Sequence, residues 1–231
     1  MAINIEKYPD ITKKAFVDNY IKSFDVHPVP NPTAIFMAGL PGSGKTEFSK
    51  NLVSIIKDKK PVRIDMDEIA SQIKGYTPKE ADKFREPATR LLNGILDKVL
   101  KQKVEFILDG TFGSRNSIKN IKRAINHGYT IRIIYIIQEP KIAWHFTEMR
   151  EKVEHRSITL EGFVETYFNI IKNITEITPL IENNDKIILD IISKDKNTAI
   201  GLWQANVKKE IDKYTNLSYN TKTLKEYLHD R

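Results

Sequence analysis

The chain has 231 residues, of which 40% are hydrophobic and 29% are charged, a balance that indicates a globular protein with no fibrous or low-complexity signal. It has no cysteine, so disulfide scaffolds, thiolate metal sites and cysteine nucleophiles are excluded. The net charge is +7, and because the lysines are spread along the chain, we interpret it as a basic surface around an anion site. A nucleic-acid partner is the less favoured interpretation of the same charge.

The sequence carries no sign of export or membrane insertion. Residues Met1–Tyr8 include Glu6 and lack the apolar core of a secretory signal. The longest apolar runs, such as Ile131–Ile137, are too short to span a bilayer. We therefore expect a cytoplasmic protein with no membrane association.

The hydrophobic pattern predicts helices and strands that alternate along the chain. A helix at residues 10–24 is followed by three prolines, which form a stiff linker. Short apolar runs predict strands at residues 34–38, 62–65, 105–109, 129–137 and 186–192. Further helices are expected at residues 45–57, 66–74, 77–101, 114–127, 140–152 and 159–174, and in the tail at residues 203–214 and 223–229. Pro87 should kink or split the helix at 77–101.

The sequence GLPGSGKT at residues 39–46 matches the P-loop pattern G-x-x-x-x-G-K-[ST] in full, between a predicted strand and a predicted helix. Its backbone N–H groups and the helix N-terminus favour a bound phosphate. We expect Lys45 to reach the β- and γ-phosphates of a nucleoside triphosphate and the Thr46 hydroxyl to hold Mg²⁺. The predicted nucleotide-binding residues are Gly39, Pro41, Gly42, Ser43, Gly44, Lys45, Thr46 and Glu47.

The fold that follows is an α/β fold of the P-loop NTPase or kinase type, with a five-stranded, mainly parallel sheet and helices on both faces. We expect one domain over residues 1–231. It consists of an amino-terminal helix and linker at 1–32, a nucleotide-binding core at 33–192 and a carboxy-terminal extension at 193–231.

Acidic residues follow two of the predicted strands. Asp65 and Asp67 close the second strand, where a kinase needs a carboxylate that accepts the proton of the acceptor hydroxyl. The alternative, equally supported, is that this pair caps the helix at Glu68. Asp109 closes the third strand, and there a carboxylate could touch Mg²⁺ or its waters, bind the acceptor or cap the turn.

Two arginines, Arg150 and Arg156, lie near the end of the helix that begins at Pro140. Phosphoryl transfer needs cations over the β–γ bridge as charge develops, so this pair could contact phosphates. Solvated surface charge is the alternative.

Together, the P-loop, the I-D-M-D segment at residues 64–67, the L-D-G-T segment at 108–111 and the two arginines resemble the zeta toxins. These are P-loop kinases of bacterial toxin–antitoxin systems, and the resemblance covers roughly residues 8–192. It implies ATP and Mg²⁺ as cofactors, a nucleotide sugar, UDP-N-acetylglucosamine, as acceptor of the phosphoryl group on its 3′-hydroxyl, and an antitoxin as a possible partner.

The resemblance also assigns roles to single residues. It implies that Asp67 is the catalytic base, that Thr111 contacts the acceptor, and that Arg150 and Arg156 are the paired catalytic arginines. The acceptor-binding glutamate of the family falls near Asn93 here, and the arginine that follows the G-T element is displaced to Arg115. The predicted acceptor-binding residues are thus Asp67, Asn93, Asp109, Thr111 and Arg115, and the predicted metal-binding residues are Thr46 and Asp109.

The sequence is compatible with three functions. The first is a zeta-like kinase of a nucleotide sugar, and the second is a kinase with another acceptor, either a polynucleotide or a different metabolite. The third is a non-catalytic nucleotide-binding switch, which would need a segment that senses the γ-phosphate.

Overall fold

The protein is described here from a computed structural model, which covers residues 9–56, 60–154, 158–202, 207–214 and 219–229. Its core is one sheet of six strands in the order β2-β3-β1-β4-β5-β6. The strands are β1 (Thr33–Ala38), β2 (Val62–Asp65), β3 (Phe106–Asp109), β4 (Thr130–Ile137), β5 (Ile187–Ser193) and β6 (Thr198–Leu202). The first five are parallel, so their carboxyl ends meet at one edge of the sheet.

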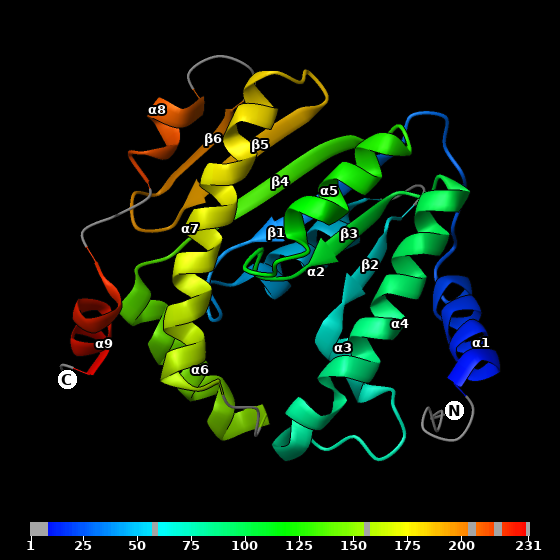
Figure 1. Ribbon diagram of the computed structural model, residues 1–231, viewed down its shortest axis with the longest axis horizontal. Helices are drawn as coiled ribbons and strands as arrows, with labels where there is room; N and C mark the ends of the chain where they lie inside the picture. The colour runs from blue at the N-terminus through cyan, green and yellow to red at the C-terminus, as the bar shows by residue number, and fades with distance from the viewer. Residues whose placement is uncertain (1–8, 57–59, 155–157, 203–206, 215–218, 230–231) are drawn as a thin grey trace.

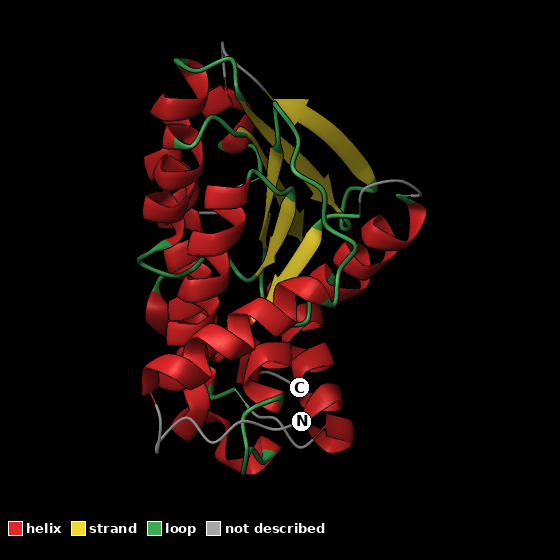
Figure 2. Cartoon of the chain, turned by 90° about the vertical axis from the view of Figure 1, so that its right-hand side faces the viewer, coloured by secondary structure: helices red, strands yellow, loops and turns green. Residues whose placement is uncertain are grey.

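Helices lie on both faces of this sheet (Figures 1 and 2). The helices are α1 (Pro9–Lys22), α2 (Lys45–Ile55), α3 (Met66–Ser71), the 3₁₀ turn η1 (Pro78–Glu80), α4 (Ala81–Gln102), α5 (Ser117–Asn126), α6 (Pro140–Glu154), α7 (Leu160–Glu182), α8 (Val207–Ile211) and α9 (Thr221–His229). No helix of the described residues is both long enough and apolar enough to cross a membrane.

The two faces of the sheet bury different cores. On one face, α2 packs Phe48 and Leu52 against a small cluster that includes Met37 and Ile134. On the other face, α4, α5 and α7 cover a much larger cluster, and α1 packs on α4 (Figure 1). Strand β1 serves both cores because its successive side chains point to opposite faces. This packing fixes the end of β1, from which the P-loop emerges.

The prediction of a parallel α/β sheet between helices is confirmed, but the number of strands is wrong. The sixth strand, β6, pairs antiparallel with β5 at the edge of the sheet and lies within the predicted carboxy-terminal extension. Its sequence, TAIGL, is exposed or half-buried at every position, so it lacks the apolar run that marks the inner strands.

Two helices also differ from their predicted course. Helix α4 is not split at Pro87: it loses the one backbone hydrogen bond that a proline cannot donate, but its buried residues from Ala88 to Leu100 pack against the core. Helix α7 continues to Glu182 rather than ending near residue 174, and its buried residues extend to Ile181. In the tail, α8 begins at Val207, and residues 203–206 of the predicted helix lie outside the described part of the chain.

Candidate active site

The P-loop is the turn between β1 and α2, and its backbone is shaped to face an anion. Gly39, Gly42 and Gly44 all have positive φ angles, and Gly44 is the N-cap of α2 at φ 85°. No side chain caps this helix, so its first N–H groups are left for a ligand. Of the other predicted nucleotide-binding residues, Pro41 and Ser43 lie in the loop, while Thr46 and Glu47 lie in the first turn of α2.

Helix α6 packs directly on this loop. A Cβ atom on Gly42 would lie 2.1 Å from the carbonyl oxygen of Ala143 and 3.2 Å from the Cβ of Phe146, so only glycine fits. The close approach fixes the start of α6 over the phosphate loop. Arg150 lies one turn beyond Phe146 on this helix, whereas Arg156 lies outside the described residues.

Lys45 is buried inside the loop and donates a hydrogen bond to the carbonyl oxygen of Leu40 at 2.5 Å. Burial lowers the pKa of Lys45 to about 8; the charge of Asp109 opposes this shift and the charge of Arg150 adds to it. Although Arg150 is exposed, its charge therefore acts on Lys45. A triphosphate bound in the loop would place negatively charged oxygens beside the ammonium group of Lys45.

Asp65 and Asp67 have different positions after β2. The Asp65 side chain caps α3, because its Oδ1 accepts hydrogen bonds from the backbone N of Asp67 at 2.8 Å and of Glu68 at 3.2 Å. Burial, and next the charge of Asp109, raise the pKa of Asp65. The side chain of Asp67 is exposed in the first turn of α3, at the carboxyl edge of the sheet. The helix-capping role therefore belongs to Asp65.

Asp109 lies at the end of β3, directly beside Asp65 in the register of the sheet. Its Oδ2 accepts hydrogen bonds from the Ser49 hydroxyl at 2.6 Å and from Nε of Arg63 at 3.1 Å. The Ser49 hydroxyl also lies 3.0 Å from the carbonyl oxygen of Thr46. One serine thus links the two residues that were predicted to bind metal.

The segment after β3 joins the P-loop to helix α7. The backbone N of Gly39 donates to the carbonyl oxygen of Thr111 at 3.1 Å. The next residue, Phe112, has a φ of 66°, which is rare for a bulky side chain. The buried side chain of Asn173 on α7 donates to the carbonyl oxygens of Phe112 at 2.7 Å and Ser114 at 3.0 Å. These two bonds hold the strained turn that presents Thr111.

Arg115 and Asn93 are the remaining predicted acceptor residues. Arg115 is exposed in the same loop. Asn93 is half-buried on α4, one turn after Thr89, whose hydroxyl lies 3.9 Å from the sulfur of Met66 at the start of α3. This face of α4 therefore packs toward α3, the helix that carries Asp67.

The comparisons with known proteins agree with this geometry. The family model described as Zeta toxin matches residues 18–208. The chain belongs to the zeta toxin family. Members of this family are kinases that use ATP on a P-loop fold, which indicates a phosphotransferase.

The chain is also similar to individual proteins. It is 33% identical over 106 residues to an uncharacterized protein of Haemophilus influenzae, a match over 45% of this chain and 69% of that protein. A chain from the PezAT chromosomal toxin–antitoxin system of Streptococcus pneumoniae matches with a TM-score of 0.69 and 19% identity, over 96% of this chain and 89% of that one. A chain of the AvrRxo1-ORF1:AvrRxo1-ORF2 complex matches with a TM-score of 0.65 and 10% identity, over 90% of this chain and 73% of that one. At these identities the two structures show a shared fold.

Three residues of this zeta-family site were not predicted from the sequence. Arg63 contacts Asp65 and Asp109 from within β2, and it is a charged residue between two buried apolar residues of this strand, Val62 and Ile64, which is a usable signal. Asn173 lies within a long helix and gives no local signal. Lys194, in the turn after β5, has its Nζ 2.5 Å from the point where a Cβ of Gly44 would stand.

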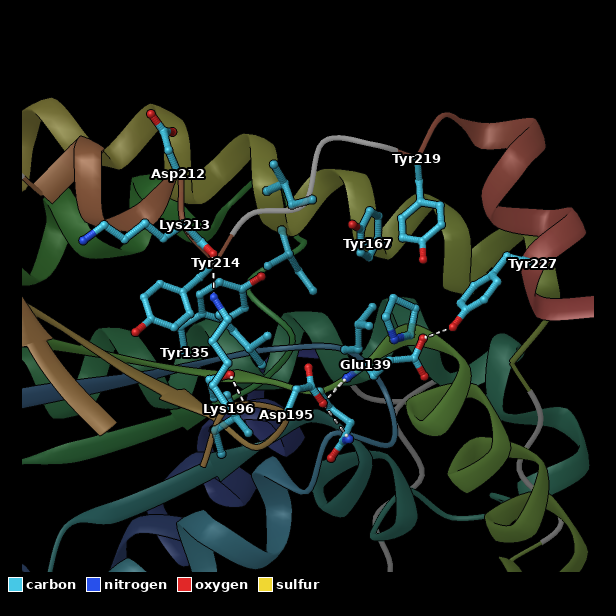
Figure 3. Close-up of a pocket in the computed structure, with 18 residues that line it drawn as sticks. Tyr135, Glu139, Tyr167, Asp195, Lys196, Asp212, Lys213, Tyr214, Tyr219 and Tyr227 are labelled. Carbon is cyan, nitrogen blue, oxygen red and sulfur yellow. Dashed lines mark hydrogen bonds between the residues drawn. The ribbon is translucent and has the colours of Figure 1, made fainter. Parts of the chain in front are cut away.

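A cavity of about 460 Å³ lies behind Leu40, between the ends of β4 and β5, helix α7 and the carboxy-terminal segment (Figure 3). Its walls carry five tyrosines: Tyr135, Tyr167, Tyr214, Tyr219 and Tyr227. The Tyr227 hydroxyl donates to Glu139 Oε1 at 2.8 Å, which ties α9 to the start of α6 (Figure 3). Among the described residues that line the cavity, none is a predicted site residue, but Leu40 of the P-loop forms part of its wall, so the cavity adjoins the P-loop.

Proposed function

We propose that this chain is a Mg²⁺-dependent kinase that transfers the γ-phosphoryl group of ATP to a hydroxyl of a nucleotide sugar such as UDP-N-acetylglucosamine. The observation that carries the proposal is the arrangement at one sheet edge. A P-loop with a buried Lys45 lies beside the carboxylate of Asp109, and the exposed Asp67 follows the neighbouring strand. This is the set of groups that positions a triphosphate and activates a hydroxyl.

On the donor side, the loop N–H groups and Lys45 would bind the phosphates. Lys45 would leave the carbonyl oxygen of Leu40 and take the oxygens between the β- and γ-phosphates. Arg150, whose charge already reaches Lys45, would neutralise the charge that develops on the bridging oxygen. Arg156 is proposed as its partner in this role.

The residues present fit a magnesium ion. Among the described residues, no cluster of three His, Asp or Glu side chains could hold a metal alone. Magnesium typically binds one or two protein oxygens together with substrate phosphates, and the Thr46 hydroxyl and Asp109 would supply such oxygens. Ser49 contacts both residues, at the backbone carbonyl of Thr46 and at Oδ2 of Asp109. When bound, the ion would neutralise negative charge on the phosphates.

On the acceptor side, Asp67 would accept the proton of the attacking hydroxyl. The hydroxyl oxygen forms a bond to the γ-phosphorus, the bond from that phosphorus to the β–γ bridging oxygen breaks, and ADP leaves with the electron pair. Thr111, Asn93, Arg115 and Asp109 would hold the acceptor. The choice of a nucleotide sugar rests on membership of the zeta toxin family.

An antitoxin is the proposed protein partner. The support is that one similar structure belongs to a toxin–antitoxin system and the other to a two-protein complex.

The proposal is tested by incubating the protein with γ-labelled ATP and a panel of UDP-sugars, nucleosides and oligonucleotides. We expect label on a UDP-sugar, and none with the Asp67→Asn variant. Label on an oligonucleotide would identify a polynucleotide kinase and contradict the proposed acceptor. ATP binding with no transfer to any member of the panel would favour the nucleotide-binding switch.

A further inference from the structure

Arg63 is a buried cation in the middle of the site. It is 5% exposed and lies on β2 between Val62 and Ile64, which are fully buried. A lone charge at such a place is costly, so its contacts must offset the loss of water. Burial works against its charge, but Asp65 and Asp109 together raise the pKa of Arg63 further above its ordinary value. The guanidinium therefore stays charged.

The guanidinium reaches three elements at once. Its Nε donates to the Ser49 hydroxyl on α2 at 2.9 Å and to Asp109 Oδ2 at 3.1 Å, and one Nη also contacts that Oδ2. The same Nη donates to Asp65 Oδ2 at 2.6 Å, and the other lies 2.6 Å from Glu68 Oε2. Arginine can make these contacts together because its donors form a rigid planar fork.

Arg63 contacts Oδ2 of Asp109 and Oδ2 of Asp65, so Oδ1 of each carboxylate is left for a different contact. Every hydrogen bond that Asp109 accepts within the described part of the chain ends on Oδ2, so Oδ1 is the oxygen that remains for a metal or its water. Asp65 uses Oδ2 for Arg63 and Oδ1 for the backbone N–H groups at the start of α3. The orientation of the helix that carries Asp67 is thus tied to Arg63.

We propose that Arg63 is a positioning residue for phosphoryl transfer, which fixes the metal-facing oxygen of Asp109 and the start of α3 in one arrangement. The inference rests on the proposed function, because it assigns Arg63 to the same site. The competing interpretation is that Arg63 only neutralises two buried carboxylates and stabilises the fold.

The test uses Arg63→Lys, which keeps the charge but loses the planar fork. The matched control is Arg132→Lys, since Arg132 also contacts a carboxylate, Asp190, with two nitrogens, but near the amino end of β4. For each protein we would measure kcat, the melting temperature, and the affinity for mant-ATP with and without Mg²⁺. Binding of mant-ATP does not depend on turnover.

For Arg63→Lys we expect unchanged affinity for mant-ATP without Mg²⁺. The strengthening of this affinity by Mg²⁺ and the kcat should each fall about 10–100-fold, the usual effect of losing a group that orients a metal ligand. Arg132→Lys should change neither. If Arg63→Lys lowers only the melting temperature, or weakens nucleotide binding equally with and without Mg²⁺, the proposal is wrong.

Two further outcomes are an Arg63→Lys variant that does not fold and a wild type that transfers no phosphate. If Arg63→Lys does not fold, Ser49→Ala removes one partner of the guanidinium without leaving a buried charge, and the same selective loss of the Mg²⁺ effect is expected. A normal Mg²⁺ effect in Ser49→Ala would then overturn the proposal. If the wild type transfers phosphate to no acceptor, the proposed function fails, yet the mant-ATP measurements still decide the role of Arg63.

Discussion

The donor side and the acceptor side of this site are built in different ways. The proposed donor side is centred on one contiguous stretch, residues 39–46, whose backbone would provide most of the binding groups, and Arg150 joins it from α6. The acceptor side collects single side chains from α3, from α4 and from the loop after β3. Their positions depend on distant partners: Asn173 holds the turn at Phe112 across 61 positions of sequence, and Arg63 holds Asp109 across 46.

This difference separates the effects of mutations on the two sides. A backbone cradle tolerates changes elsewhere as long as its glycines and the packing of α6 remain. Side chains held by long-range hydrogen bonds are displaced when one distant partner is lost. We therefore expect donor-side changes to weaken ATP binding and acceptor-side changes to reduce transfer while ATP binding stays intact.

The largest effect is expected on the acceptor side, from Asp67→Asn. The variant keeps the size of the side chain but cannot accept the proton of the acceptor hydroxyl, so the transfer rate should fall by about 10²–10⁴. Affinity for ATP should stay within about twofold, because the side chain is proposed to face the acceptor. Steady-state kinetics and ATP titration check the two halves of this expectation.

Asp65→Asn is the matched control, since Asp65 lies two positions away and caps α3. It should mainly lower the melting temperature, because asparagine can still cap the helix but Arg63 would lose one charged partner. Near-normal transfer in Asp67→Asn, or a complete loss in Asp65→Asn at unchanged stability, would contradict the assignment of the base.

On the donor side, Lys45→Met should weaken ATP binding and lower kcat together, by about 10²–10³ in rate. The melting temperature of the ligand-free variant should be equal to or higher than that of the wild type, because burial disfavours the charge of Lys45 when no phosphate is present. Thermal unfolding with and without ATP measures both. A variant that is stabilised by ATP as strongly as the wild type would refute the donor assignment.

The sheet could be predicted from the sequence wherever an element buries an apolar run. The five parallel strands are such runs, and the P-loop motif placed the first of them at the centre of the site. Strand β6 could not be predicted, because it is short, lies at the edge of the sheet and shows only one apolar alternation, at Ile200 and Leu202. The unbroken course of α4 through Pro87 depends on packing that the sequence does not show.

The site was predictable to the extent that it depends on local motifs. The pattern at residues 64–67 gave both aspartates, but which one caps α3 required the coordinates. Arg63 could have been noticed as a charge between the apolar residues Val62 and Ile64, whereas its three carboxylate partners come from β2, β3 and α3. Nothing near Asn173 in the sequence indicates that it holds a loop after β3.

A smaller effect on the acceptor side is expected from Asn173→Leu. Without the two donated hydrogen bonds, Phe112 should leave its left-handed conformation, which costs about 1–3 kcal/mol to maintain, and Thr111 should move. We expect KM for the acceptor to rise about tenfold, as for the loss of one hydrogen bond to substrate, while ATP affinity is unchanged. Initial-rate kinetics with each substrate varied in turn separate the two.

Thr178→Val on the same helix is the control for Asn173→Leu. Thr178 is buried as well, but its hydroxyl bonds only within α7, to the carbonyl oxygen of Ile174 at 2.7 Å. It should leave both KM values unchanged. Equal rises in the KM for ATP and for the acceptor in Asn173→Leu would mean that α7 supports the whole site rather than the acceptor loop.

The smallest expected effect is the uptake of protons by Lys45 when ATP binds. Because the pKa of Lys45 in the ligand-free protein is about 8, the lysine is partly neutral just above that pH. The unfolded chain binds more protons than the folded one between pH 8 and its ordinary pKa of 10.5, so this group makes stability rise with pH in that window. Bound triphosphate raises the pKa again, and binding must then take up a proton.

Calorimetric titration with ATP, in two buffers with different ionisation enthalpies, measures this uptake. At about pH 8.5 we expect roughly three quarters of a proton per ATP, since about a quarter of Lys45 is charged beforehand. At about pH 6.5 the contribution of Lys45 should vanish, and above its pKa the affinity should fall by up to about tenfold per pH unit. Lys45→Met should lose the uptake near pH 8.5. If the wild type and this variant take up the same number of protons there, the ammonium of Lys45 does not meet the phosphates, and the donor side must bind ATP through its backbone alone.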